Sequence, residues 1–377
     1  MKLVYLDNAA TTKMSKKVIE EMIESFENIY GNPSSTHTLG QKAKAVVENA
    51  RHIVAKNLKV EAKEIVFTSG GAEGNNLVIK GFLKQNKDKG KHIITTKIEH
   101  STVLKTFESL EKQGYDVTYI DVTKDGIIDV EKLKKAVRKD TALVSVMFVN
   151  NETGVIQPIK EISEYLKEKE IFFHTDAVQA IGKFEIYPKE LRIDALTVSS
   201  HKFYGPKGTG FVFIDKKYNI EKEIFGGSQE RNRRAGTENV NGILGTGVAL
   251  EEVYEKMEVI FEHEKKIQEY LEEKLKNEIG RIQKVEINGE NSRRVKNITN
   301  VFIENTDIQM LLVALDMRGI CVSGGSACMS GSLENSYVLE AMGLNDEKLK
   351  SSFRISIGKD TTIEEIDYFI ENLKEII

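Results

Sequence analysis

The stretch "EIVFTSGGAEGNNLVIKGFLKQN" (residues 64–86) joins two different patterns of hydrophobicity through a turn that is rich in glycine. Its first part, residues 64–69, is a short apolar run of the kind that forms a buried strand. From Asn75 onward, apolar residues recur three or four positions apart, which predicts an amphipathic helix. A strand that leads through a tight turn into a helix is the repeating unit of an α/β protein.

The same alternation continues on both sides of this stretch, as far as about residue 215. Further short apolar runs predict six more strands, and sequences with helical spacing lie between them. These six runs are residues 92–96, 117–122, 142–149, 171–177, 195–200 and 210–214. Because the runs are continuously apolar, we expect an α/β fold with a mostly parallel seven-stranded sheet that is flanked by helices.

The C-terminal third of the chain predicts a second, smaller α/β domain. Apolar residues at helical spacing run from Val253 to Leu275 and predict one long helix that leads into it. A chain of 377 residues is long enough for two cores. We expect residues 15–258 to form the large cofactor-binding domain, and residues 1–14 and 259–377 to form the small one.

Composition excludes several classes of protein. The net charge is −4 and the clusters of basic residues are short, so we expect no direct contact with nucleic acid. No apolar run is long enough to cross a bilayer, and we expect no membrane partner. Two cysteines without a disulfide framework are typical of a reducing compartment. These features predict a soluble cytoplasmic protein.

Polar residues follow the predicted strands at their carboxyl ends, where ligands bind in open α/β sheets. The glycine turn after the first strand places free backbone N–H groups at the start of a helix, which suits a phosphate. His100 follows another strand, and Ser101 is the predicted cap of the next helix. The other strand ends contribute Asn151, Asp176, Gln179, Ser199, His201 and Lys202. A phosphate cradle, an aromatic platform, a buried acid and an amine together meet the requirements of pyridoxal phosphate.

Several motifs resemble those of the class V aminotransferase family and, within it, the cysteine desulfurases of the NifS/IscS type. The motifs are "YLDNAATT" (5–12), "NNETG" (150–154), "HTDAVQA" (174–180), "SSHKFYGPKG" (199–208), "SGGSAC" (323–328) and "RISIG" (354–358). The resemblance implies the pyridoxal-phosphate-dependent transferase fold of type I. It also implies a homodimeric enzyme that converts L-cysteine to L-alanine.

The resemblance also implies a role for individual residues. Lys202 would form the Schiff base, Asp176 would face the pyridine nitrogen, and His100 would stack on the ring and transfer a proton. Asn151 and Gln179 are implied near the ring hydroxyl, and Gly71, Ala72, Ser199, His201 and Thr237 at the phosphate, with Thr237 supplied by the partner subunit.

Arg354 is implied to bind the substrate carboxylate, together with Asn151. The strand pattern supports this role independently of the resemblance. Phe353 and Ile355 share one face of the predicted strand, which leaves Arg354 on the other face, toward a crevice. Arginine is also the residue best suited to bidentate recognition of a carboxylate.

Cys328 lies in a glycine- and serine-rich segment, residues 323–335, whose backbone can adopt many conformations. The resemblance implies that Cys328 takes the sulfur as a persulfide and passes it to an acceptor, such as an iron–sulfur scaffold or a tRNA-thiolation enzyme. Cys328 could also be a transient iron–sulfur ligand, but it supplies one of the four ligands that a cluster needs. Cys321, in the apolar stretch "GICV", is interpreted as a small hydrophobic residue.

Ala72 departs from the family pattern, which usually has threonine at this position, and it predicts weaker retention of the cofactor. Three other functions were weighed. Selenocysteine lyase, or another lyase or aminotransferase with the same cofactor, remains an alternative that does not need Cys328. A non-catalytic carrier of sulfur or of a cluster is disfavoured by the single loop cysteine. A nicotinamide dehydrogenase is set aside because the first strand is not followed by G-x-G-x-x-G.

Overall fold

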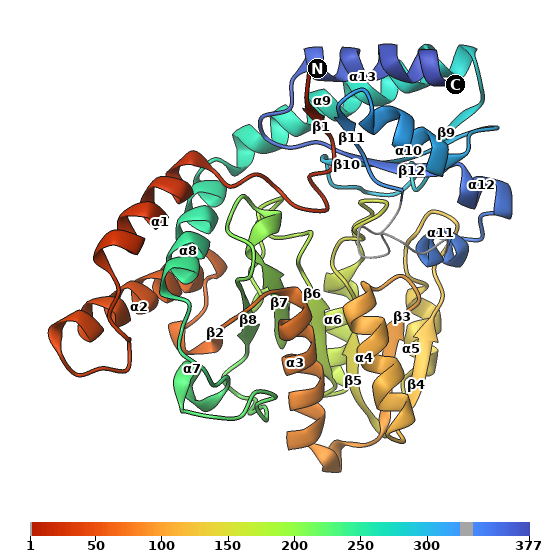
Figure 1. The fold of residues 1–377 in the computed structure, drawn as a ribbon. Helices are drawn as coiled ribbons and strands as arrows, with labels where there is room; N and C mark the ends of the chain where they lie inside the picture. Colours follow the sequence, from red (N-terminus) through yellow and green to blue (C-terminus); the bar gives the residue numbers. More distant parts are fainter. Residues whose placement is uncertain (1, 325–334) are drawn as a thin grey trace.

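The computed structural model describes residues 2–324 and 335–377. A seven-stranded sheet is its largest element, with helices α3 (Gly71–Gln85) and α4 (Ser101–Lys112) on the near side in Figure 1. The strands, in spatial order, are β2 (Ile65–Thr68), β8 (Gly210–Ile214), β7 (Ala195–Ser199), β6 (Phe172–Asp176), β5 (Thr141–Ser145), β3 (His92–Thr96) and β4 (Asp116–Ile120). β8 runs antiparallel to both of its neighbours, and the other pairs are parallel. The predicted mostly parallel sheet of seven strands is confirmed.

Burial on both faces explains why these strands are continuously apolar. Every residue of β3, β5, β6, β7 and β8 is buried. The remaining helices of this part are α1 (Lys16–Asn28), α2 (Thr38–Leu58), α5 (Val130–Ala136), α6 (Ile159–Glu168), α7 (Gln229–Asn232) and α8 (Val240–Glu255). Side chains on one face of the sheet, such as Val144 and Phe173, share a core with α2 and α8, whereas Leu143 and Phe172 pack with α3 and α4 on the other face.

The C-terminal part of the chain packs around a separate hydrophobic cluster. Its three-stranded antiparallel sheet has β10 (Ile298–Ile303) between β12 (Ser352–Ser356) and β9 (Val285–Ile287). The helices are α9 (Met257–Asn277), α10 (Ile308–Asp316), α11 (Tyr337–Ala341), α12 (Asp346–Lys350) and α13 (Ile363–Ile376). In Figure 1, α9 and α13 lie side by side above the small sheet.

The N-terminus joins this C-terminal part. β1 (Val4–Tyr5) pairs in parallel with β11 (Ile320–Cys321), and Val4 and Leu6 belong to the same hydrophobic cluster as Phe353. This arrangement agrees with a small domain built from both ends of the chain. The division at residue 258 stays a prediction.

The expected single long helix between Val253 and Leu275 is wrong. α8 ends at Glu255 and α9 begins at Met257, because Lys256 has φ −107° and ψ 11°, outside the helical region. The two helices serve different cores: Val253 packs in the large cluster, and Leu271 packs in the small one. Within the described ranges, no helix is both long enough and apolar enough to span a membrane.

Candidate active site

A cavity of about 520 Å³ gathers residues from the carboxyl ends of the strands, the N-terminal segment and the C-terminal part of the chain. The predicted residues that line it are Gly71, Ala72, His100, Asn151, Asp176, Gln179, Ser199, His201, Lys202 and Arg354. Thr237 is exposed and is not among the lining residues. The prediction for Cys328, including its role as a metal ligand, lies outside the described residues. In the described chain no group of three or more His, Cys, Asp or Glu residues could hold a metal ion.

The turn before α3 forms an open cradle at one end of the cavity. Gly70 has φ 143°, a conformation that L-residues rarely adopt, so glycine is required here. A Cβ atom added to Gly70 would lie 3.3 Å from Ser199 Oγ, and one added to Gly71 would lie 3.2 Å from Val178 Cγ2. Without a Cβ atom, these two glycines leave room beside the side chains of Ser199 and Val178. The first N–H groups of α3 have no partner within the helix and suit an anion.

Lys202 lies at the end of a short 3₁₀ turn, Ser200–Lys202, that follows β7. Its Nζ donates hydrogen bonds to the carbonyl oxygens of Ala9 (2.6 Å) and Ala10 (2.7 Å). The N-terminal segment therefore brings acceptors to a lysine almost 200 residues away in sequence. Burial, with the charges of Lys202 and Lys207, lowers the pKa of His201 to about 4, so this imidazole is neutral at neutral pH.

Asp176, at the end of β6, is 5% exposed and held by two N–H donors. Asn75 Nδ2 donates to its Oδ2 (2.8 Å), and the backbone N–H of Val178 donates to its Oδ1 (3.0 Å). The same amide of Asn75 donates to Thr102 Oγ1 (2.9 Å), which is 2.9 Å from His100 Nδ1. Asn75 and Thr102 were not predicted as site residues, because only the packing of α3 against α4 brings them together.

His100, and not the predicted Ser101, caps α4. The backbone N–H of Thr102 donates to His100 Nδ1 (3.2 Å), and Ser101 is already the first residue of the helix. A backbone N–H can only donate, so Nδ1 of His100 is an acceptor and the ring proton of the neutral form is on Nε2. The cap thus leaves an N–H donor at the other ring nitrogen.

Glu99 is a fully buried acid directly before His100. Its Oε1 accepts from the backbone N–H of Met147 (2.8 Å) and from Thr96 Oγ1 (2.7 Å). Its Oε2 is buried and has no hydrogen-bond partner within residues 2–324 and 335–377. Burial raises the pKa of Glu99 to about 8, against these two hydrogen bonds, and the nearby charge of Asp176 raises it further. Glu99 is therefore largely neutral at pH 7.

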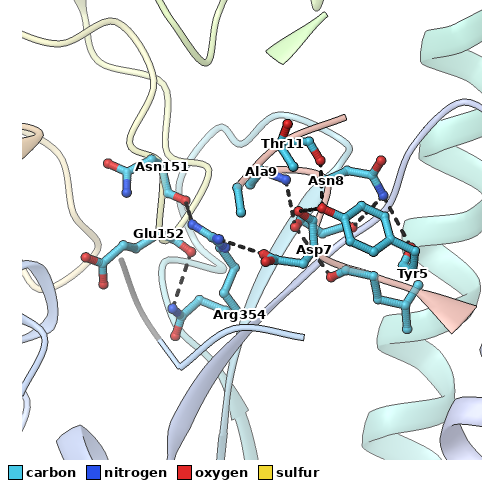
Figure 2. A network of polar contacts seen from close by, with 12 residues as sticks. Tyr5, Asp7, Asn8, Ala9, Thr11, Asn151, Glu152 and Arg354 are labelled. Carbon is cyan, nitrogen blue, oxygen red and sulfur yellow. Dashed lines mark hydrogen bonds and ion pairs between the residues drawn. The ribbon is translucent and has the colours of Figure 1, made fainter. Parts of the chain in front are cut away.

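Arg354 reaches the cavity from β12 and is 1% exposed, so the predicted direction of its side chain is confirmed. Its Nη1 donates to the carbonyl oxygen of Asn151 (2.8 Å), and its Nη2 donates to Asp7 Oδ1 (2.8 Å). Figure 2 shows this guanidinium between the loop that carries Asn151 and the N-terminal segment. Among the described residues, Arg354 Nε and Asn151 Oδ1 are both buried without a hydrogen-bond partner. Asp7 lies in the motif "YLDNAATT", but no role was predicted for it from the sequence.

Cys321 is half-buried in β11 and is a free thiol. Burial, and then the charges of Asp316 and Asp7, raise the pKa of this thiol. The thiolate, which is the nucleophilic form, is therefore disfavoured. This position agrees with the interpretation of Cys321 as a small hydrophobic residue.

The chemical groups in this cavity match those that pyridoxal phosphate needs. The turn at Gly70 and Gly71, where a Cβ atom would take up space, suits the phosphate. The buried carboxylate of Asp176 suits a protonated ring nitrogen. Lys202 supplies a primary amine at the same cavity. The orphaned Asn151 Oδ1 and Arg354 Nε offer one acceptor and one donor to a bound molecule.

Comparison with known proteins agrees with this fold. The chain matches the aminotransferase class-V family over residues 4–369. A cysteine desulfurase IscS from Clostridium botulinum (strain Hall) is 48% identical, and the alignment covers 100% of this chain and 94% of that one. A solved structure described as a NifS-like protein has a TM-score of 0.93 at 38% identity, with 100% of this chain and 99% of that one covered. Another, described as SspA in complex with cysteine, has a TM-score of 0.84 at 34% identity and covers 95% and 100% of the two chains.

The chain therefore belongs to the aminotransferase class-V family, whose members are pyridoxal-phosphate-dependent enzymes. Within that family it belongs with the cysteine desulfurases of the NifS/IscS type.

Proposed function

We propose that this enzyme converts L-cysteine to L-alanine and transfers the sulfur atom to Cys328 as a persulfide. The observation that carries the proposal is the single cavity that joins Lys202, Asp176 and His100 to Arg354. Two findings support cysteine as the substrate. Relatives of this chain are named cysteine desulfurase, and one similar solved structure is described as a complex with cysteine.

Pyridoxal phosphate, when bound, would withdraw electrons from the substrate and so allow a proton to leave its Cα atom. The first N–H groups of α3, with Ser199 and His201, would hold the phosphate, and Asp176 would hold the ring nitrogen. Asn75 orients the carboxylate of Asp176 through the 2.8 Å hydrogen bond. Asn151 and Gln179 lie in the same cavity and would contact the ring hydroxyl.

Lys202 would move the proton. As a neutral amine its Nζ accepts the Cα proton of cysteine, and as an ammonium it returns a proton during formation of alanine. The carbonyl oxygens of Ala9 and Ala10 accept hydrogen bonds from this nitrogen and so can stabilise its ammonium form. Arg354 would hold the substrate carboxylate, with Asn151 beside it.

His100 would donate a hydrogen bond from Nε2 to the substrate sulfur. The thiolate of Cys328 would attack that sulfur, so that one S–S bond forms while one C–S bond breaks. The electron pair of the C–S bond stays on the carbon atom, which takes up a proton and becomes the methyl group of alanine. Cysteine and the Cys328 thiol together give alanine and the Cys328 persulfide, which balances without an external oxidant. An acceptor protein, such as an iron–sulfur scaffold or a tRNA-thiolation enzyme, would then take the sulfur.

Product analysis tests this function directly. The purified enzyme loaded with pyridoxal phosphate is incubated with L-cysteine and dithiothreitol, and alanine and sulfide are both quantified. We expect the two products in equal amounts. Pyruvate and ammonia in place of alanine would identify a different lyase and would contradict the proposal.

We further propose a homodimer with composite sites. Helix α1 exposes Ile23 (54%) and Phe26 (62%), and Tyr30, which follows the helix, is 73% exposed. Elsewhere on the surface, Phe225 is 70% exposed. Large exposed apolar side chains are typical of a surface that another chain covers. Thr237 is exposed and outside the cavity of its own chain, which suits a residue that serves the phosphate of the partner subunit. A location in the cytoplasm stays a prediction from the low cysteine content.

The change of Ala72 to threonine should strengthen cofactor binding. Ala72 lines the cavity in the first turn of α3, where a hydroxyl group would reach an anion held by the backbone. One hydrogen bond to a charged group contributes about 1.5–3 kcal/mol, which is roughly 10- to 150-fold in affinity. The measurement is the amount of cofactor that the parent and the Ala72→Thr variant retain through long dialysis. Equal retention would show that the missing hydroxyl has no effect.

A further inference from the structure

Asp7 bonds to the same guanidinium that is proposed to hold the substrate carboxylate. Asp7 Oδ1 lies 2.8 Å from Arg354 Nη2, and the two side chains are 19% and 2% exposed. Within residues 2–324 and 335–377, Arg354 is the only residue that bonds to the carboxylate of Asp7. Arg354, which is proposed to bind the substrate carboxylate, is therefore already paired with a carboxylate of the protein itself (Figure 2).

The donors of Arg354 show how a second carboxylate would bind. Nη1 is bonded to the carbonyl oxygen of Asn151 and Nη2 to Asp7, whereas Nε is buried and has no hydrogen-bond partner in the described part of the chain. A carboxylate that binds in the bidentate way needs two adjacent N–H groups of the guanidinium. A substrate carboxylate must therefore share this cation with Asp7. Two negative groups a few ångströms apart in a poorly solvated cavity repel each other more strongly than in water.

The backbone of Asp7 is held by a β-bridge and by hydrogen bonds, which keeps its short side chain beside the guanidinium. Asp7 forms a β-bridge to Ser356, on the strand that carries Arg354. The hydroxyl of Tyr5 donates to the carbonyl oxygens of Asp7 (3.0 Å) and Thr11 (2.8 Å). Burial, and then the charge of Asp7, raise the pKa of Tyr5 to about 12, so the phenol keeps the proton that it donates.

We propose that Asp7 weakens the binding of α-carboxylates to Arg354 and so limits how tightly the substrate and the product are held. The inference rests on the proposed function, in which cysteine enters and alanine leaves through the same carboxylate contact. An interaction that is equally strong before and during the reaction lowers KM without raising kcat, and it retains the product. The negative charge of Asp7 weakens the contact between Arg354 and the α-carboxylate, and alanine is therefore released faster.

The test is the variant Asp7→Asn, which keeps the size of the side chain and an oxygen acceptor for Nη2 but removes the charge. Calorimetric titration of the cofactor-loaded enzyme with L-alanine should show binding about tenfold tighter than in the parent. KM for L-cysteine should fall by a similar factor, and kcat should not rise. The control is Asp88→Asn, an exposed acid at the far end of α3 from the cavity, which should change neither quantity.

Binding of L-alanine that is unchanged or weaker in Asp7→Asn would overturn the proposal, because a purely structural ion pair predicts that result. If this variant does not fold, Asp7→Ser provides a second uncharged side chain and should also tighten binding. The titration does not depend on sulfur transfer. If the parent enzyme binds L-alanine but makes none from cysteine, the proposed function fails while the role of Asp7 is still measured.

Discussion

Replacing Lys202 by alanine is expected to reduce the formation of alanine from cysteine by about 10³-fold or more. A positioned general base or acid contributes about 10²- to 10⁴-fold, and this variant also loses the amine that bonds covalently to the cofactor aldehyde. Lys202 is the only predicted site residue with a primary amine, and Ala9 and Ala10 already hold that amine by their carbonyl oxygens. The measurement is single-turnover alanine formation, together with the absorption band of the cofactor Schiff base and its loss on reduction with borohydride.

The matched control for this variant is Lys105→Ala, which removes an exposed lysine on the surface of α4. Its rate and its cofactor spectrum should both equal those of the parent. Partial recovery of Lys202→Ala by added methylamine would show that the missing group is the amine. Turnover by Lys202→Ala at the parent rate would contradict the assignment of this residue and, with it, the reading of the whole cavity.

The second large effect is expected for Cys328→Ser. Serine cannot take a sulfur atom as a persulfide, so release of sulfide from L-cysteine should fall below detection, about 10³-fold or more. Cys328 contributes no atom to the proposed cofactor site, so the absorption spectrum should stay that of the parent. Sulfide is quantified under dithiothreitol, and the persulfide on the parent enzyme is identified by the mass of the peptide that contains Cys328.

Cys321→Ser is the matched control, because it removes the other cysteine of the chain. The raised pKa of the Cys321 thiol and its place in β11 predict activity within about twofold of the parent. The same pair of variants separates the alternative function. If Cys328→Ser still releases selenium from selenocysteine at the parent rate but no sulfide from cysteine, selenocysteine lyase is a second activity of the site. Parental sulfide release by Cys328→Ser would contradict the proposed sulfur transfer.

The architecture of the large sheet followed from the sequence because its cause is local. Continuous apolar runs, such as residues 210–214, can be buried on both faces only in a covered sheet, and all seven predicted strands are present. The break between α8 and α9 was not predicted, because its cause is not local. Val253 and Leu271 both fit one helical pattern, and only the presence of two separate cores explains why the helix ends at Glu255.

By itself, the sequence determined which side chains meet at the carboxyl ends of the strands, because parallel strands bring their ends to one edge. Lys202, Asp176 and His100 were predicted in this way, and all three line the cavity. Only the tertiary structure decided which residues form hydrogen bonds and ion pairs with the side chains of the site. Asn75 reaches Asp176 across about 100 residues, and Asp7 reaches Arg354 across almost 350. Contacts over such separations leave no periodic signal in the chain, since they depend on how the small domain and the N-terminal segment pack over the sheet.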